Sequence, residues 1–265
     1  KIDVVDQTFI AEKIEIVSDI LGISVIDVLN DEDKLNMTSI TQPLLVLSSA
    51  IYAEAYKQMS LPSPQIIAGH SLGEYSALTF AESISFEDAI KITHLRGTLM
   101  QNSEKGMMMA ILGLDANIID NACSEITDKN RDAYVTSANY NSLKQTVIAG
   151  NEKGINKAKV LLSKMGAKRC IELNVSIASH SSLMKDAAFK FNKTLEEIEF
   201  SNPKYPIIQN FTGKVENNIT LIKKNLFNQL TKPVLWTKTM ESLSKVSSCL
   251  IEIGPKNVLC GLSKG

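Results

Sequence analysis

Residues 66–75, with the sequence IIAGHSLGEY, constrain the fold of this chain more than any other segment. They contain the pattern G-x-S-x-G, which follows a short apolar run bounded by prolines and precedes the helical spacing of residues 71–83. The pattern suits a nucleophilic serine on a sharp turn between a strand and a helix, because the glycines let the backbone bend. Alone, it also fits an ordinary glycine-flanked turn. In this context it predicts that Ser71 is a nucleophile and that residues 62–71 form a buried strand inside a sheet.

The composition limits the partners and the compartment that we expect for this chain. With 265 residues and a net charge of −1, the chain can bury a large core, and it has no long basic run for binding nucleic acid. No apolar stretch is long enough to span a bilayer and no export signal opens the chain, so we expect a soluble, cytoplasmic protein without a membrane partner. Because the chain does not begin with methionine, we expect that its original N-terminus was cut, replaced or left out.

The cysteines argue against a metal site. They lie far apart in the sequence, without a C-x-x-C pair or a nearby histidine cluster. This spacing predicts neither a zinc site nor a disulfide framework, so we expect no bound metal and a reducing compartment. The cysteines are Cys123, Cys170, Cys249 and Cys260.

Helical periodicity dominates the N-terminal part of the chain. Apolar residues recur at helical spacing in residues 6–22 and 41–59, where Thr41 before Pro43 marks a helix start. A capping box opens a further helix over residues 85–101. In the C-terminal part we expect a helix at 183–198, a strand at 205–213, a helix ending within 228–236, and a strand-turn-helix at 249–263.

The middle of the chain changes to short strands and helices. Their order, strand, helix, strand, strand, helix, strand, is that of the ferredoxin-like βαββαβ unit. The expected elements are residues 106–114, 115–127, 133–139, 145–150, 151–166 and 168–174, with a turn at 140–144. We therefore predict a small ferredoxin-like subdomain, residues 105–175, inserted into a layered, hydrolase-like α/β domain formed by residues 1–104 and 176–265.

A serine nucleophile needs a base within hydrogen-bond reach, and this chain offers three histidines. His70 adjoins Ser71 and should point away from its hydroxyl, and His94 lies in a helix, so we expect both to be structural or solvent-facing. His180, where the chain returns from the small subdomain, is the candidate base. No acidic residue stands out as a third member, because a backbone carbonyl can orient the imidazole. Arg96 lies among apolar helical residues, where an arginine usually forms a structural ion pair.

Six blocks of sequence resemble malonyl-CoA:acyl carrier protein transacylases, in the same order over nearly the whole chain. They are AGHSLGEYSAL, HLRGTLMQ, SANYNSLKQTVIAG, SIASHSSLM, QLTKPVLW and EIGPKNVLCGL. The resemblance implies a hydrolase-like α/β domain with a ferredoxin-like insertion, and a ping-pong transfer of malonyl from malonyl-CoA to the phosphopantetheine thiol of acyl carrier protein. It implies no bound cofactor, since the carrier brings the phosphopantetheine. For a chain of this size we expect a monomer that serves fatty acid synthesis.

The resemblance also implies roles for individual residues. Ser71 would be the nucleophile, and His180 the base that takes its proton and returns one to the leaving thiol. Arg96 would form a bidentate pair with the malonyl carboxylate, which disfavours acetyl groups because they leave a buried charge unpaired. The backbone carbonyl of Gln229 would orient His180. The amide of Leu72, helped by the N-terminus of the following helix, would stabilise the oxyanion.

Two features depart from the family pattern. The family begins with a strand and a GQGSQ loop that supplies a second oxyanion donor, and this chain has no such loop. Losing one donor costs about 2.7–4 kcal/mol, so we expect this chain to be nearly inactive compared with a version that carries the native N-terminus. Ile177 and Ala178 precede Ser179 and His180 at a place where family members vary with acyl size. Malonyl is therefore the expected acyl group, with methylmalonyl as the alternative.

Two other functions stay open at the level of sequence. A serine esterase or thioesterase would share the Ser-His pair but pass the acyl group to water. Arg96 discriminates, because a hydrolase of neutral esters has no use for a buried cation at the acyl group. A non-catalytic, carrier-docking module would tolerate the loss of Ser71. Because carrier proteins are usually acidic, we also expect a basic rim near the site, with Lys185 and Lys190 as members.

Overall fold

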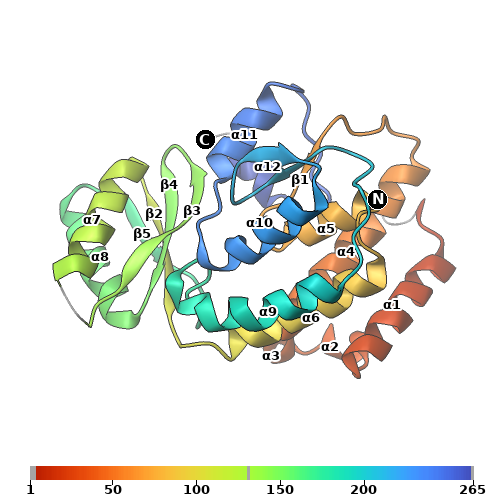
Figure 1. The fold of residues 1–265 in the computed structure, drawn as a ribbon, viewed down its shortest axis with the longest axis horizontal. Coiled ribbons are helices and arrows are strands. Elements are labelled where there is room, and N and C mark those ends of the chain that lie inside the picture. The colour runs from red at the N-terminus through yellow and green to blue at the C-terminus, as the bar shows by residue number, and fades with distance from the viewer. Residues whose placement is uncertain (1–3, 130–131, 264–265) are drawn as a thin grey trace.

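A computed structural model describes residues 4–129 and 132–263 of the chain, which form two parts. Figure 1 shows the larger part as a group of helices around a short sheet, and the smaller part, at the left, as two helices beside a second sheet. The two sheets have three and four strands. The predicted fold class, an α/β domain with an inserted small subdomain, is confirmed.

The helices and strands of the larger part come from both sides of the insertion. The helices are α1 (Gln7–Leu21), α2 (Val25–Val28), α3 (Glu32–Leu35), α4 (Thr38–Gln58), α5 (Gly73–Phe80), α6 (Phe86–Gln101), α9 (Lys185–Glu197), α10 (Ile219–Thr231), α11 (Trp236–Ser244) and α12 (Val258–Leu262), with a 3₁₀ turn η2 (Ser182–Met184). The strands are β1 (Ile67–Ala68), β6 (Ile207–Gln209) and β7 (Lys214–Glu216). The expected helices are all present, and α6 begins with the predicted cap, since the Asp88 N–H donates to the Ser85 Oγ at 3.0 Å.

Helix α4 begins about one turn earlier than the sequence predicted. It starts at Thr38 rather than at Thr41, so that Pro43 lies inside the helix. A proline has no N–H group for the carbonyl four residues earlier, here that of Ser39. His94 of α6 replaces the missing donor, with its Nδ1 atom 2.9 Å from the Ser39 carbonyl oxygen. His94 is therefore structural, as expected.

Strand β1 lies at an edge of the three-stranded sheet, and the prediction that it lies inside the sheet was wrong. The sheet order is β1-β6-β7, and β1 pairs only with β6, in parallel, with Ile67 opposite Ile207. Within the described residues nothing pairs with its other edge, and Ile67 and Ala68 are partly exposed. The predicted strand at the start of residues 249–263 was also wrong. It has no neighbouring strand in the described chain, and only α12 forms there, because a strand needs a partner for its N–H and C=O groups.

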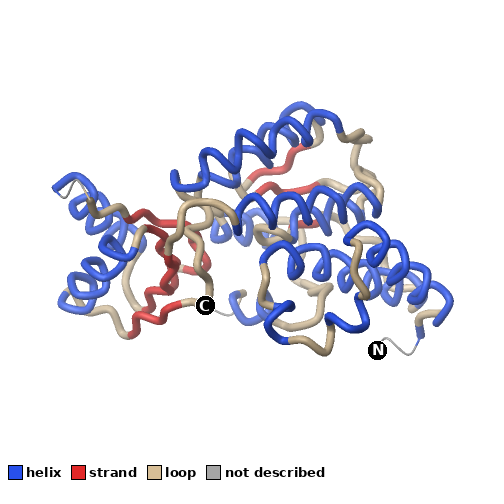
Figure 2. Tube along the Cα trace, turned by 90° about the horizontal axis from the view of Figure 1, so that it is seen from below, coloured by secondary structure: helices blue, strands red, loops and turns tan. Residues whose placement is uncertain are grey.

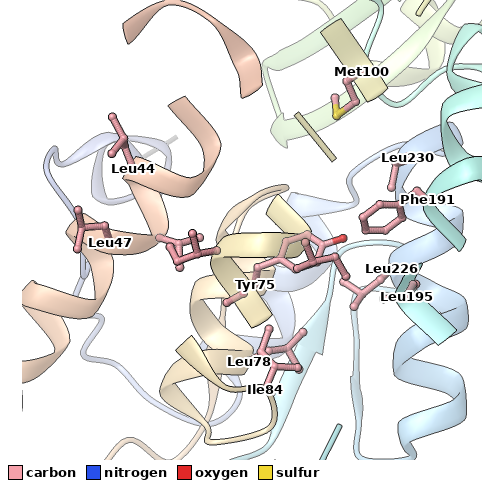
Figure 3. Close-up of a cluster of buried hydrophobic side chains, with 14 of the residues drawn as sticks. Leu44, Leu47, Tyr75, Leu78, Ile84, Met100, Phe191, Leu195, Leu226 and Leu230 are labelled. Atoms are coloured by element: carbon pink, nitrogen blue, oxygen red, sulfur yellow. The ribbon is translucent and has the colours of Figure 1, made fainter. Parts of the chain in front are cut away.

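The main core lies where α5 and α6 pack between α4 on one side and α9 with α10 on the other (Figure 3). Tyr75 of α5 is fully buried, and its ring meets that of Phe191 of α9 edge-on with the centroids 6.4 Å apart. Leucines of α4, α5, α9 and α10 belong to the same buried cluster, together with Met100 of α6. This packing holds α5 in place, and with it the turn that carries Ser71.

The smaller part has the predicted βαββαβ order. Its elements are β2 (Met107–Leu112), α7 (Ala116–Lys129), β3 (Val135–Ser142), β4 (Gln145–Gly150), α8 (Glu152–Lys164) and β5 (Arg169–Glu172). The strands pair antiparallel in the order β3-β4-β2-β5, the ferredoxin-like arrangement. Strand β3 continues to Ser142, past two irregularities in its pairing, so the turn is shorter than the predicted 140–144.

Side chains alternate across the small sheet, so both of its faces are buried. Met109 and Ile111 face the cluster under α7 and α8, whereas Met108 and Ala110 face the other cluster, with Ala178 of the larger part. In Figure 2 the two helices lie on the outer side of the strands and the larger part on the other. The boundaries 104/105 and 175/176 stay a prediction, and residues 1–3 and 264–265 at the ends of the predicted large domain lie outside the described residues. None of the described helices is long and apolar enough to cross a membrane.

Candidate active site

Ser71 sits on a strained turn between β1 and α5. Its φ angle is +52°, in the left-handed region that a serine rarely adopts. Gly69 allows the turn, because a Cβ atom there would lie 1.9 Å from the carbonyl oxygen of Gly73, whereas a Cβ atom at Gly73 would meet nothing within 4 Å. Asn210, directly after β6, holds the turn at both ends. Its Oδ1 atom accepts the Ser71 N–H, and its Nδ2 atom donates to the Gly69 carbonyl at 2.6 Å.

His180 lies beside the Ser71 hydroxyl, as predicted. Its Nε2 atom is 2.8 Å from Ser71 Oγ, and its Nδ1 atom is 2.6 Å from the backbone carbonyl oxygen of Gln229. Since a carbonyl only accepts, Nδ1 carries the proton and Nε2 is free to accept one from the hydroxyl. His180 also has a positive φ angle, +59°, and is buried. Burial, with the Arg96 charge as the second cause, lowers the pKa of His180 to about 3, so the imidazole is neutral at pH 7.

Arg96 of α6 reaches the same space from the core. Its side chain is buried, and its Nη2 atom donates to Ser71 Oγ at 3.3 Å and to Gln229 Oε1 at 3.1 Å. Its Nη1 atom donates to Gln42 Oε1 at 2.7 Å, and the Tyr75 ring centroid lies 5.8 Å from the guanidinium carbon. No carboxylate of residues 4–129 or 132–263 forms an ion pair with it, so the alternative of a structural ion pair was wrong. A buried cation thus lies beside the nucleophile without a direct counter-charge.

The sequence did not single out three buried polar side chains that connect these groups. Gln42 of α4 binds Arg96, Asn210 holds the turn, and Glu74 of α5 is bonded to both Asn210 and Gln229. Burial raises the pKa of Glu74 to about 8, and its hydrogen bonds and the charge of Arg96 act in the opposite direction. The available signal was the placement of Gln42 and Glu74 among apolar helical residues, where a polar side chain needs a partner.

The Leu72 N–H is positioned to receive negative charge from a group on Ser71. It lies at the amino end of α5, and among the described residues no acceptor is bonded to it. A free backbone N–H next to a nucleophile, at a helix N-terminus, is the usual composition of an oxyanion site.

His70 points away from the Ser71 hydroxyl, as expected. Its Nε2 atom is 2.9 Å from Oδ1 of Asn141 on β3, and its ring centroid is 5.1 Å from that of Trp236. His70 therefore links the turn to the small sheet.

The remaining predicted positions are two lysines on α9 and two residues that precede His180 in the sequence. Lys185 and Lys190 are exposed on α9 and line a depression of about 360 Å³ together with Ser182 and Leu183. Asp186 and Glu104 line it too, so its charge is mixed. Ile177 and Ala178 are both buried. A role for any of the four in binding stays a prediction.

The described residues contain no group of three or more His, Cys, Asp or Glu side chains that could hold a metal ion. Acyl transfer through a serine ester suits the groups that they do contain. These are a hydroxyl, a neutral imidazole in contact with it, a free amide and a buried guanidinium.

Comparison with known proteins points to the same chemistry. Residues 4–263 match the family described as the acyl transferase domain. The malonyl CoA-acyl carrier protein transacylase of Haemophilus influenzae is 42% identical over 237 residues, which cover 88% of this chain and 75% of that protein. The corresponding protein of Escherichia coli K12 is 40% identical over 236 residues, with the same two coverages.

Solved structures agree closely with the fold. An acyl carrier protein S-malonyltransferase from Vibrio cholerae superposes with a TM-score of 0.92 at 40% identity, covering 98% of this chain and 86% of that one. A malonyl-transacylase in complex with its type II PKS acyl-carrier protein has a TM-score of 0.91 at 39% identity, covering 96% and 84%. A match over nearly all described residues, joined to relatives at this identity, shows that the chain belongs to the acyl transferase domain family.

Proposed function

We propose that this chain transfers a malonyl group from malonyl-CoA to the phosphopantetheine thiol of acyl carrier protein, through a malonyl ester on Ser71. One observation carries the proposal: the buried guanidinium of Arg96 lies 3.3 Å from a hydroxyl that is itself 2.8 Å from a neutral imidazole. The pair Ser71 and His180 can form an acyl ester, and the cation nearby favours an acyl group that carries a carboxylate.

In the first half-reaction, the malonyl group moves to Ser71. His180 Nε2 takes the hydroxyl proton while Ser71 Oγ attacks the thioester carbon, and negative charge moves to the carbonyl oxygen, where the Leu72 N–H stabilises it. When the C–S bond breaks, His180 gives its proton to the sulfur of coenzyme A. The Gln229 carbonyl, bonded to Nδ1, stabilises the imidazolium that exists between these two steps.

The second half-reaction reverses the first with another thiol. The phosphopantetheine thiol gives its proton to His180 and attacks the ester carbon, the bond from that carbon to Ser71 Oγ breaks, and the proton returns to Oγ. The protein then has no acyl group and can accept the next one.

Arg96 provides selectivity by its burial. A malonyl carboxylate would pair with the guanidinium, whereas an acetyl group leaves the cation without a partner, at a cost of about 3–5 kcal/mol. The names of the relatives support malonyl as the acyl group and an acyl carrier protein as the acceptor. We place the role in fatty acid synthesis, with polyketide synthesis as the alternative, and expect a cytoplasmic monomer without a bound cofactor.

The test is the intact mass of the protein after brief exposure to malonyl-CoA and, separately, to acetyl-CoA. We expect a malonyl adduct that is removed by carrier protein, much less acetyl adduct, and no adduct on a Ser71→Ala variant. Ser60→Ala is the matched control, because Ser60 is an exposed serine that also has a positive φ angle. A malonyl adduct lost equally fast to water alone would favour a thioesterase. Because a missing oxyanion donor slows acylation about a hundredfold to a thousandfold, the exposure is also prolonged by that factor, and no adduct even then would refute the proposal.

A further inference from the structure

Glu74 is a buried carboxyl group that takes no part in the steps above. It is the second residue of α5 and is 1% exposed. Its Oε1 atom accepts the backbone N–H of Asn210 at 2.9 Å, and its Oε2 atom accepts a hydrogen bond from Nε2 of Gln229. We infer that Glu74 is a positioning residue, which holds the side chain of Gln229, and through it Arg96, in the orientation that selects a malonyl group. The inference rests on the proposed function.

The Gln229 side chain must point one way for this arrangement to form. Its Oε1 atom accepts from Arg96 Nη2 at 3.1 Å, and its Nε2 atom donates to the Ser71 carbonyl oxygen at 3.0 Å as well as to Glu74. If the amide turned over, its NH₂ group would face the guanidinium, and two donors would be in contact. Two acceptors at the Nε2 end, the carboxylate of Glu74 and the carbonyl of Ser71, exclude that orientation.

The distance between the carboxyl group of Glu74 and the guanidinium of Arg96 also affects how Arg96 can bind a malonyl carboxylate. A carboxylate in direct contact with Arg96 would compete with the malonyl carboxylate for the same N–H groups. Glu74 instead lies one amide away from the guanidinium, so its charge, when the carboxyl group is ionised, favours the buried cation, and no carboxylate in the described part of the chain occupies the Nη2 N–H that points at Ser71 Oγ. The Gln229 amide thus connects Glu74 to Arg96 by two hydrogen bonds, and the carboxylate and the guanidinium form no direct ion pair.

Replacing Glu74 by glutamine leaves one acceptor oxygen for two donors, the Asn210 N–H and Nε2 of Gln229. The Asn210 N–H belongs to the backbone and cannot turn away, so the new amide oxygen would accept from it. The new NH₂ group would then face Nε2 of Gln229, two donors in contact, and the Gln229 amide would rotate. Arg96 would lose its Gln229 acceptor and its fixed position beside Ser71.

The experiment measures selectivity in a competition between malonyl-CoA and acetyl-CoA. The ratio of the two kcat/KM values is read from the two adducts on Ser71 by intact mass, at a pH above the Glu74 pKa of about 8, where the carboxyl group is ionised. We expect Glu74→Gln to lower this ratio about tenfold or more, the effect of losing one hydrogen bond to a charged group. The ratio does not depend on the fraction of folded protein, so a loss of stability alone would not change it. Glu82→Gln is the matched control, because Glu82 is an exposed carboxylate just beyond α5, paired with Lys204.

A second variant tests the route through Gln229. Gln229→Ala keeps the backbone carbonyl that meets His180 and removes only the side chain, so it should lower the ratio as Glu74→Gln does. In the double variant the Glu74 change should add no further loss, because the group it acts through is gone.

The inference would be overturned if the malonyl-to-acetyl ratio of Glu74→Gln lay within about twofold of that of the parent protein. It would also be overturned if the Glu74 change lowered the ratio in the double variant by as much as it does alone. If Glu74→Gln does not fold, Gln229→Ala decides alone, and an unchanged ratio there would have the same meaning. Failure of the proposed function would look different, because the parent protein itself would then take up no malonyl group or show no preference for it.

Discussion

Nη2 of Arg96 and Oγ of Ser71 are 3.3 Å apart, so a buried cation and the proposed nucleophile share one small space. We expect Arg96→Ala to reduce malonylation of Ser71 by about a hundredfold or more relative to acetylation, because a broken buried charge pair costs about 3–5 kcal/mol. The measurement is the ratio of the two adducts by mass. Lys91→Ala, on the exposed face of the same helix, should leave the ratio unchanged. Equal losses of both adducts in Arg96→Ala would argue against a role in selectivity.

The two glycines of the G-x-S-x-G pattern should respond differently to the same substitution. At Gly69 a Cβ atom would lie 1.9 Å from backbone, whereas at Gly73 it would meet nothing within 4 Å. We therefore expect Gly69→Ala to unfold the turn and abolish acylation, and Gly73→Ala to stay folded and active. Thermal unfolding and adduct formation would be measured for both. A stable, active Gly69→Ala protein would contradict the close approach described above.

Asn210 should affect the rate more than substrate binding. Its side chain bonds to the Ser71 N–H and to the Gly69 carbonyl, so Asn210→Ala leaves two backbone groups of the turn unpaired. We expect unfolding to become easier by about 1–3 kcal/mol for each group, and kcat to fall with little change in KM. Denaturant unfolding and steady-state kinetics would check both effects. The exposed Asn217→Ala is the control, and a changed KM with an unchanged kcat would show that the turn tolerates the loss.

His180 should make the stability of the protein depend on pH. Its pKa falls from the ordinary value of 6.5 to about 3 in the folded protein, mainly by burial. Below pH 6.5 the unfolded chain binds a proton that the folded one does not, so this contribution to stability is complete above pH 6.5 and is lost as the pH falls toward 3. We expect His180→Asn to reduce the slope of the unfolding free energy in that window by up to about 1.4 kcal/mol per pH unit.

Chemical denaturation at several pH values would measure that slope. His94→Asn, which removes an imidazole outside the site, is the control for the loss of a histidine. An identical slope in His180→Asn and in the parent protein would mean that the imidazole titrates normally in the folded state.

Local patterns were sufficient to predict much of the fold. The order of short strand-like runs and helical stretches predicted the βαββαβ unit of the small subdomain, and the strand-serine-helix order predicted the turn at Ser71. Where a strand lies in a sheet depends on its neighbours, which periodicity does not contain. This is why β1 was expected inside the sheet, and why a strand was expected at the start of residues 249–263.

The residues of the candidate site also differ in whether a local pattern predicts them. Ser71 has a motif, and His180 was the histidine left after elimination. Asn210 and Gln42 have no motif in the reasoning from sequence, because their function arises only when chain segments far apart in the sequence come together. The Ser71 N–H and the Asn210 side chain are separated by 139 residues.

Two of the non-glycine residues with positive φ among the described residues are Ser71 and His180, the two members of the proposed catalytic pair. Such conformations cost on the order of 1–3 kcal/mol each, and they persist only where the surrounding structure enforces them. The alignment of hydroxyl and imidazole is therefore established once, when the chain folds, rather than anew in every turnover. A more relaxed backbone at either residue would give a more stable protein and a slower one, so stability and speed are opposed at these two positions.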